Sequence, residues 1–204
     1  MKENKLIKIL IPVIAVIVVF ESIVLVSNLN NSPLNTNELE EENEMLEQKD
    51  VVEPVADFIW ETDSLEMKVG KTYNVTLNLL SKQDLVLDSV ETHVYFDPKM
   101  ATVSKLVTNK EIGEELKSAG VDNKTGLIES ILWYGEEKGV GFKSKKEDTV
   151  KVLSFMVTPK LEGKLDFDLS TSMTDTKLAT IIVDTNTGKA LAYLSNKLEI
   201  NVTK

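Results

Sequence analysis

The residues best able to do chemistry in this sequence stand around its only histidine. His93 has Glu91 two positions before it and Tyr95 two positions after it. Residues two apart in an extended strand share a face, so an imidazole, a carboxylate and a phenol would lie side by side. A single histidine excludes most zinc sites and catalytic triads, and the absence of cysteine excludes thiolate ligands and cysteine nucleophiles. The stretch therefore indicates a surface that touches a partner.

Two pairs of adjacent carboxylates are the remaining candidates for acid–base chemistry. Glu136 and Glu137 fall in an expected loop, and Glu114 and Glu115 in an expected short helix. Nothing but their number recommends either pair as the two carboxylates of a glycosidase. The sequence also lacks a serine in a nucleophile elbow and a glycine-rich phosphate loop. We expect no enzymatic activity and no cofactor.

Metal binding has equally weak support. The stretch DTNTG, residues 184–188, begins like a calcium loop. It lacks the third oxygen ligand before the glycine and the glutamate that completes an EF-hand loop. Asp122 with Asn123 is no stronger. A hairpin turn is the ordinary explanation of DTNTG, so we expect no metal site.

The charge of the chain excludes one class of partner. All 23 basic residues are lysines, 33 residues are acidic, and the formal net charge is -10. Such a chain repels nucleic acid, and without arginine it lacks the planar donor fork that grips phosphate. We expect no nucleic-acid binding.

The amino terminus has the pattern of a membrane anchor. Three lysines among the first eight residues precede an apolar run over residues 9–26, in which Glu21 is the only charge. A helix of this length, extended by its flanks, is just long enough to cross a bilayer, and the lysines should stay in the cytoplasm. Residues 1–27 are therefore expected to form a single transmembrane helix in the cell membrane, with the rest of the chain extracellular. The alternative is a cleaved signal peptide.

Residues 28–57 have a polar, acidic composition that predicts a flexible linker. Leu39 and Leu46 stand seven residues apart, so a short helix or weak coiled coil is the alternative for part of it. A flexible linker would lift the following domain clear of the membrane without fixing its orientation.

From residue 58 to residue 204 the hydrophobic period changes to two. Residues 72–79 place four apolar side chains on one face and polar side chains on the other, as in a strand with one dry side. Only residues 110–120 look helical. The alternation recurs, between turn signals, over residues 90–96, 150–155 and 165–169. We expect an all-β domain, a jelly-roll β-sandwich of about nine strands in two antiparallel sheets.

Five stretches of this domain follow one another in an informative order over residues 64–202. They are MKVGKTYNVTLNLL, LDSVETHVYFDPKMATVSKLV, GLIESILWYG, TVKVLSFMV and IIVDTNTGKAL. This order resembles the cohesin-type domain of bacterial extracellular proteins, which has a strand ending in a Tyr-Asp-Pro-like corner and a Gly-x-Ile strand; here Phe96 stands where a tyrosine is common. Cohesins are similar to carbohydrate-binding modules of the same jelly-roll group. The resemblance implies a nine-stranded jelly roll that binds a protein module such as a dockerin, or less often a glycan.

Strand alternation also predicts a binding face. If the apolar residues between 90 and 96 point into the sandwich, the residues between them point out. The Gly-x-Ile resemblance places Ile128 inward, and with it Ser130, Leu132 and Tyr134. The outward residues, which we predict to contact a partner, are Glu91, His93, Tyr95, Glu129, Ile131 and Trp133. The alternative is a shift of one strand that puts Trp133 in the core, and His93 is expected to be exposed rather than a pH switch.

Three functions remain open. The first is a membrane-tethered module that docks a dockerin-like or other surface protein. The second is a carbohydrate-binding domain that holds the cell to polysaccharide, and the third is a structural subunit of the cell envelope. A flat row of exposed rings would favour sugar stacking, a mixed patch with an acidic rim would favour a protein, and buried rings would favour the structural subunit.

Overall fold

The structure is a computed structural model that describes residues 53–135, 140–171, 174 and 177–204. The expected membrane helix over residues 1–27, and the expected linker up to residue 52, lie outside the described residues. Within the described part of the chain, no helix is long and apolar enough to cross a membrane. Strands, turns and irregular segments make up that part.

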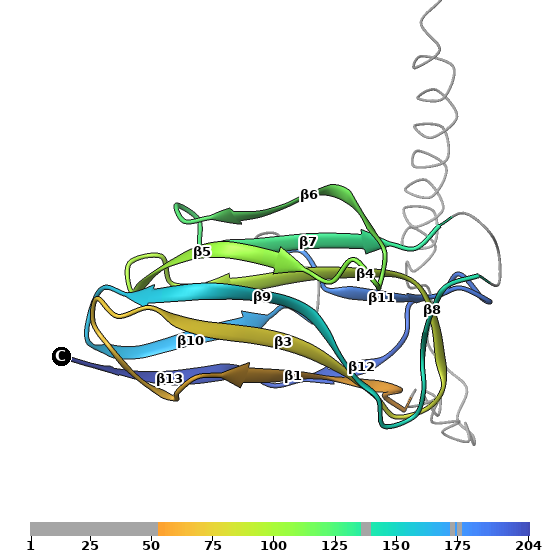
Figure 1. Cartoon of the computed structure of the whole chain (residues 1–204), viewed down its shortest axis with the longest axis horizontal. Helices are drawn as coiled ribbons and strands as arrows, with labels where there is room; N and C mark the ends of the chain where they lie inside the picture. The colour runs from red at the N-terminus through yellow and green to blue at the C-terminus, as the bar shows by residue number, and fades with distance from the viewer. Residues whose placement is uncertain (1–52, 136–139, 172–173, 175–176) are drawn as a thin grey trace, which may run out of the picture. The chain divides into compact units, whose positions relative to one another are not determined.

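Thirteen strands run through the described residues and form two sheets (Figure 1). The strands are β1 (Ala56–Thr62), β2 (Glu66–Lys68), β3 (Tyr73–Ser81), β4 (Leu85–Phe96), β5 (Ala101–Thr108), β6 (Glu114–Asp122), β7 (Leu127–Trp133), β8 (Phe142–Ser144), β9 (Thr149–Pro159), β10 (Gly163–Leu169), β11 (Ile181–Asp184), β12 (Tyr193–Ser195) and β13 (Leu198–Thr203). One sheet has the order β12-β1-β3-β9-β5. The other has the order β2-β13-β10-β4-β7-β6, and β8 and β11 also pair with β4.

The described domain is all-β, as predicted, but it has more strands than the nine expected. β2, β8 and β12 have three residues each and β11 has four. Strands this short hold at most two inward side chains, so they leave no readable alternation in the sequence. Two pairs, β1 with β12 and β2 with β13, are parallel, whereas antiparallel sheets were expected.

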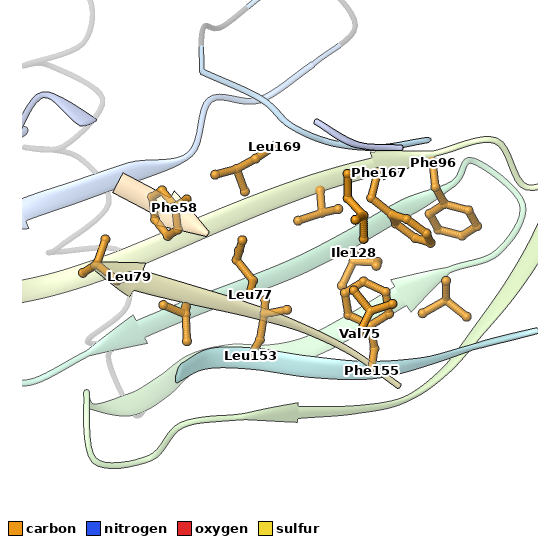
Figure 2. Packing of buried hydrophobic residues seen from close by; sticks show 14 of the residues in the cluster. Phe58, Val75, Leu77, Leu79, Phe96, Ile128, Leu153, Phe155, Phe167 and Leu169 are labelled. Atoms are coloured by element: carbon orange, nitrogen blue, oxygen red, sulfur yellow. The ribbon is translucent and has the colours of Figure 1, made fainter. Parts of the chain in front are cut away.

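Apolar side chains from the two sheets meet in a shared core (Figure 2). In β3, Val75, Leu77 and Leu79 are fully buried, as the alternation predicted. The ring of Phe167 on β10 lies 5.3 Å from that of Phe155 on β9 and 5.6 Å from that of Phe96 on β4, measured between centroids. These three rings tie the sheets together, since burying one such side chain contributes roughly 1.5–3 kcal/mol.

Strand β6 overturns the one helical prediction. The expected helix over residues 110–120 is a turn followed by a strand that pairs with β7. Every side chain of β6 is exposed or half-buried, so this segment lacks the apolar stripe by which a helix packs. Gly113 allows a close approach, because a Cβ there would stand 2.5 Å from backbone atoms of Trp133. Pairing with β6 satisfies backbone groups along β7 that a helix would leave open.

Two turns of the same construction account for the weak calcium-loop candidates. Asp122 and Asp184 begin the stretches DNKTG and DTNTG, and in each turn the glycine N–H donates to the aspartate carbonyl at 2.8 Å. Each aspartate carboxylate accepts a hydrogen bond from the threonine hydroxyl, at 2.9 Å in the first turn and 2.8 Å in the second. The turn predicted for DTNTG is confirmed, and both carboxylates serve to close their own turns.

Candidate functional site

β4 and β7 lie side by side and antiparallel in the eight-stranded sheet. Their register pairs Val94 with Ile128 and Val90 with Leu132, and all four side chains are fully buried. Thr92 and Ser130 are buried as well, so the inward assignment of both strands is confirmed with one exception. Tyr134 was expected inward but is 42% exposed. It lies beyond the end of β7, where strand alternation no longer sets its direction.

The predicted contact residues share the outer side of these two strands. Glu91 is paired with Ile131, and His93 with Glu129, while Trp133 ends β7. Directly paired residues of antiparallel strands project to the same face. All six predicted residues are therefore brought together; His93 is fully buried, and the half-buried members are Glu91, Tyr95, Glu129, Ile131 and Trp133.

The two aromatic rings of this face lie far apart. Tyr95 is paired with Leu127 at the start of β7, and Trp133 is the last residue of that strand. At about 3.4 Å per residue, six residues separate the two positions by about 20 Å. Glu129 and Ile131 stand between them. The face is a mixed patch rather than a flat row of rings.

The expectation that His93 is exposed is wrong. On β4, residues 94–96 pair with β10 and residues 87–91 pair with β11, so His93 lies between the two pairings. Ser170 N–H donates to the His93 carbonyl at 3.1 Å, and His93 N–H donates to Thr180 Oγ1 at 2.9 Å. The returning chain places the carbonyl oxygen of Ala179 3.0 Å from Nδ1 of the imidazole. Ser170, Ala179 and Thr180 therefore lie against His93, which is fully buried.

Charged side chains border the buried imidazole. His93 Nε2 lies 3.5 Å from a carboxylate oxygen of Glu91 and 3.5 Å from one of Glu129. Lys117 on β6 donates to the other oxygen of Glu129 at 2.7 Å. This hydrogen bond lowers the pKa of Glu129 below its usual value, and His93 acts in the same direction. Glu129 is therefore an ionised carboxylate with fixed partners.

Tyr95 is also held by the segment that returns to β11. Its hydroxyl oxygen accepts a hydrogen bond from the backbone N–H of Leu178 at 2.9 Å. Lys177 Nζ lies 5.0 Å from the centroid of the Tyr95 ring and 3.2 Å from a carboxylate oxygen of Asp168. A cation over an aromatic face is attracted to it, so Lys177 and the Tyr95 ring form a cation–π pair. Tyr95 is positioned by packing, not free in solvent.

The carboxylate pairs do not form a reaction centre among the described residues. Glu114 and Glu115 lie on the edge strand β6, and a hydrogen bond from the Thr108 hydroxyl lowers the pKa of Glu115. Glu136 and Glu137 lie outside the described residues. Within the described part of the chain, no group of three histidine, aspartate or glutamate side chains is arranged to hold a metal ion. The site offers contact surface, not a set of converging ligands.

The comparison with known proteins rests on structure. No protein-family model matches the sequence, and no curated protein matches it. The cohesin module of a family 33 glycoside hydrolase from Clostridium perfringens matches with a TM-score of 0.56 and 14% identity, over 74% of this chain and 98% of that one. The described domain has the cohesin fold.

Two further cohesins share that fold. One belongs to the type I cohesin–dockerin complex Coh-OlpA-Doc918 from Clostridium thermocellum, with a TM-score of 0.55 and 12% identity over 73% of this chain and 99% of that one. The other is a non-cellulosomal cohesin from the archaeon Archaeoglobus fulgidus, with a TM-score of 0.52 and 12% identity over 73% of this chain and 91% of that one. The match with this chain thus covers nearly the whole length of each of these modules.

Sequence reasoning missed several residues of this face. Leu127 is half-buried opposite Tyr95, and the same alternation that placed Ile131 outward would have found it. Lys117 was missed because its segment was expected to be helical. Ala179 reaches His93 from a position 86 residues along the chain, and no local pattern announces that contact.

Proposed function

We propose that this chain is a docking module that binds another protein through the outer face of β4, β7 and β6. We call this surface the docking face and define it by Glu91, Tyr95, Lys117, Glu129, Ile131 and Trp133. The cohesin fold supports the proposal, since similar cohesin modules are seen in complexes with dockerins. The partner is a dockerin-like or other surface protein, and the role is binding rather than catalysis.

The mixed character of the face is the observation that carries this proposal. Ile131 and Trp133 supply half-buried apolar surface, and Glu91 and Glu129 border it with negative charge. Apolar anchors with a polar rim are typical of protein interfaces. A partner that complements this face presents apolar side chains together with lysine or arginine. Sugar stacking is less well served, because the two rings are about 20 Å apart along the strand.

A capture experiment with matched variants tests this function. The full-length chain is immobilised and exposed to an envelope extract of its own organism, and the retained proteins are identified. We expect one or a few proteins to bind the wild type and to be lost from Ile131→Asp. Val107→Asp is the control, because Val107 is 52% exposed on β5 in the other sheet.

Two outcomes would contradict the docking function. Proteins retained equally by Ile131→Asp would remove the docking face from the interaction. Binding to a glycan array without any protein partner would favour the carbohydrate-binding alternative.

The second part of the proposal is a membrane tether with an extracellular domain. It rests on the lysines before the apolar run of residues 9–26 and on the acidic composition that follows. Protease added to intact cells should release a fragment that begins within residues 28–57. Protection of the domain in intact cells would refute the orientation, and a secreted product that begins near residue 28 would indicate a cleaved signal peptide.

A further inference from the structure

The docking function proposed above does not use the most unusual side chain of its face. His93 has no exposed side-chain surface, although it lies between two glutamates of the outer side, Glu91 and Glu129, whose side chains are 32% and 20% exposed. Its Nδ1 faces the carbonyl oxygen of Ala179 at 3.0 Å. A carbonyl oxygen only accepts hydrogen bonds, so Nδ1 carries a hydrogen. The second ring nitrogen, Nε2, is left to face the glutamates.

The protonation state of Nε2 decides whether this arrangement is attractive. Without a proton, Nε2 is an acceptor, and the carboxylate oxygens of Glu91 and Glu129 at 3.5 Å are acceptors too, so three lone-pair groups face one another. With a proton, the imidazolium is a charged donor between two carboxylates. The inward position of both glutamates therefore matches the protonated ring.

The neighbouring charges set the balance of this cluster. Lys117 pairs with Glu129, and Lys177 pairs with Asp168 beside Tyr95. β11 places the uncharged Ile181 opposite Glu91. The formal charges of Glu91, Glu129, Asp168, Lys117 and Lys177 cancel that of a protonated His93, and they leave one negative charge when His93 is neutral. The lowered pKa of Glu129 keeps that carboxylate ionised on both sides of the change.

We propose that His93 makes the docking face respond to pH, and this inference rests on the proposed docking function. Binding of a proton at Nε2 draws Glu91 and Glu129 against the ring and removes the net charge of the cluster. Loss of that proton removes the attraction of the ring for both carboxylates, leaves Glu129 paired with Lys117, and adds one negative charge to the face. A partner that docks through cationic side chains then binds more tightly in the deprotonated state.

The single histidine of the chain makes the first half of this inference directly measurable. Nitrogen-detected NMR of the full-length chain, prepared without a polyhistidine tag, shows one imidazole. We expect Nδ1 to stay protonated from about pH 9 to about pH 5 and Nε2 to gain a proton within that range, with the amides of Ala179 and Thr180 shifting at the same midpoint. A ring that keeps one state throughout, or a neutral ring with its hydrogen on Nε2, would overturn the inference.

Charge removal at the glutamates separates a switch from an ordinary histidine titration. In Glu91→Gln, and more so in Glu91→Gln with Glu129→Gln, the ring should gain its proton only at lower pH than in the wild type. Glu66→Gln is the control, because Glu66 is exposed on β2. An unchanged midpoint in the folded double variant would show that the glutamates do not sense the ring.

The binding half uses a ten-residue oligolysine peptide as the cationic probe. We expect the Kd reported by the amides of Ile131 and Trp133 to weaken about threefold to fivefold between about pH 8 and about pH 5.5, as one exposed charge is lost. The double glutamine variant should lose this pH dependence. A wild-type Kd that does not change with pH would refute the regulation. Failure of the envelope capture would refute the docking function and leave the NMR result standing.

Discussion

Trp133 is the residue whose removal should separate binding from folding. Its side chain is half-buried at the end of β7, outside the fully buried core. We expect Trp133→Ala to weaken docking of a captured partner by about 1–3 kcal/mol, because large rigid side chains anchor interfaces at low entropic cost. Melting and partner affinity are measured on the same variant. A loss of about 3–5 kcal/mol of stability would mean that Trp133 is a core residue after all.

Tyr95→Ala should weaken the same interaction, with a different side effect. Its hydroxyl accepts a hydrogen bond from the Leu178 N–H, so truncation also loosens the chain next to Ala179, whose carbonyl oxygen contacts His93. We expect weaker docking by about 1–3 kcal/mol and faster hydrogen exchange at Leu178. Tyr95→Phe isolates the hydroxyl, since it keeps the ring below Lys177. Unchanged docking by a folded Tyr95→Ala together with a folded Trp133→Ala would remove this face from the function.

Tyr193 gives the domain a pH limit on the alkaline side. Burial raises its pKa to about 12, although a contact with the Thr180 side chain acts in the opposite direction. The neutral hydroxyl donates a hydrogen bond to the Thr180 carbonyl at 2.7 Å. An unfolded tyrosine ionises near pH 10, so its contribution is present below about pH 10 and is lost toward pH 12. We expect the free energy of unfolding to fall by about 2–3 kcal/mol more in the wild type than in Tyr193→Phe over that range. Denaturant titrations at both pH values measure this difference. An equal fall in the free energy of unfolding for the wild type and Tyr193→Phe would contradict it.

The residues of the docking face were predictable except for Lys117, whereas the burial of His93 beside them was not. Strand alternation put Glu91 and Ile131 on the outer side, and the register confirms that they are neighbours. The exposure of a strand residue also depends on parts of the chain that are distant in sequence. His93 is contacted by Ala179, which lies 86 residues further along the chain. The alternation of a strand shows which side of the sheet each side chain faces, but it does not show which distant residues will cover that side chain.

At the scale of elements, β6 shows where pattern reasoning stops. Its sequence, rich in glutamate and lysine, has high helix propensity, and such propensity is a weak prior that tertiary context overrides. The unpaired edge of β7 supplies that context, since each of its backbone groups needs a partner. The sequence pattern predicted the strands that have several inward apolar residues. β6 has no fully buried side chain, and it joins the sheet through backbone pairing alone.

The paired turns give a prediction for two glycines. Gly126 and Gly188 both have positive φ, 77° and 64°, and both close an Asp-x-x-Thr-Gly turn. A Cβ at Gly126 would stand 2.0 Å from the carbonyl oxygen of Phe96, whereas one at Gly188 would meet nothing within 4 Å. Gly188→Ala should therefore cost about 1–2 kcal/mol from backbone strain alone, and Gly126→Ala clearly more. Equal losses in denaturant unfolding would show that the close approach is not rigid.

At the scale of the whole molecule, the described domain should fold alone. Val55 N–H donates to the Ala192 carbonyl, and Lys82 N–H donates to the Val55 carbonyl, so the domain begins before the expected boundary at residue 58. We expect residues 53–204 to form a monomer whose circular dichroism is β-rich and whose Tm is unchanged by a chelator. A large fall of Tm in chelator would reveal a metal that the turns at Asp122 and Asp184 hold after all.

The ends of the domain complete both sheets, and this has a consequence for biosynthesis. β12 pairs with β1, and β13 pairs with β2, with Asn201 opposite Glu66. The ribosome adds about 5–20 residues per second, so β1 and β2 wait roughly 7–27 s for the strands that complete their sheets. During that time the nascent chain exposes open strand edges and apolar surface, which chaperones bind. Stalled synthesis before β12 should therefore yield an aggregation-prone chain, even though nearly all of the core residues have already been made.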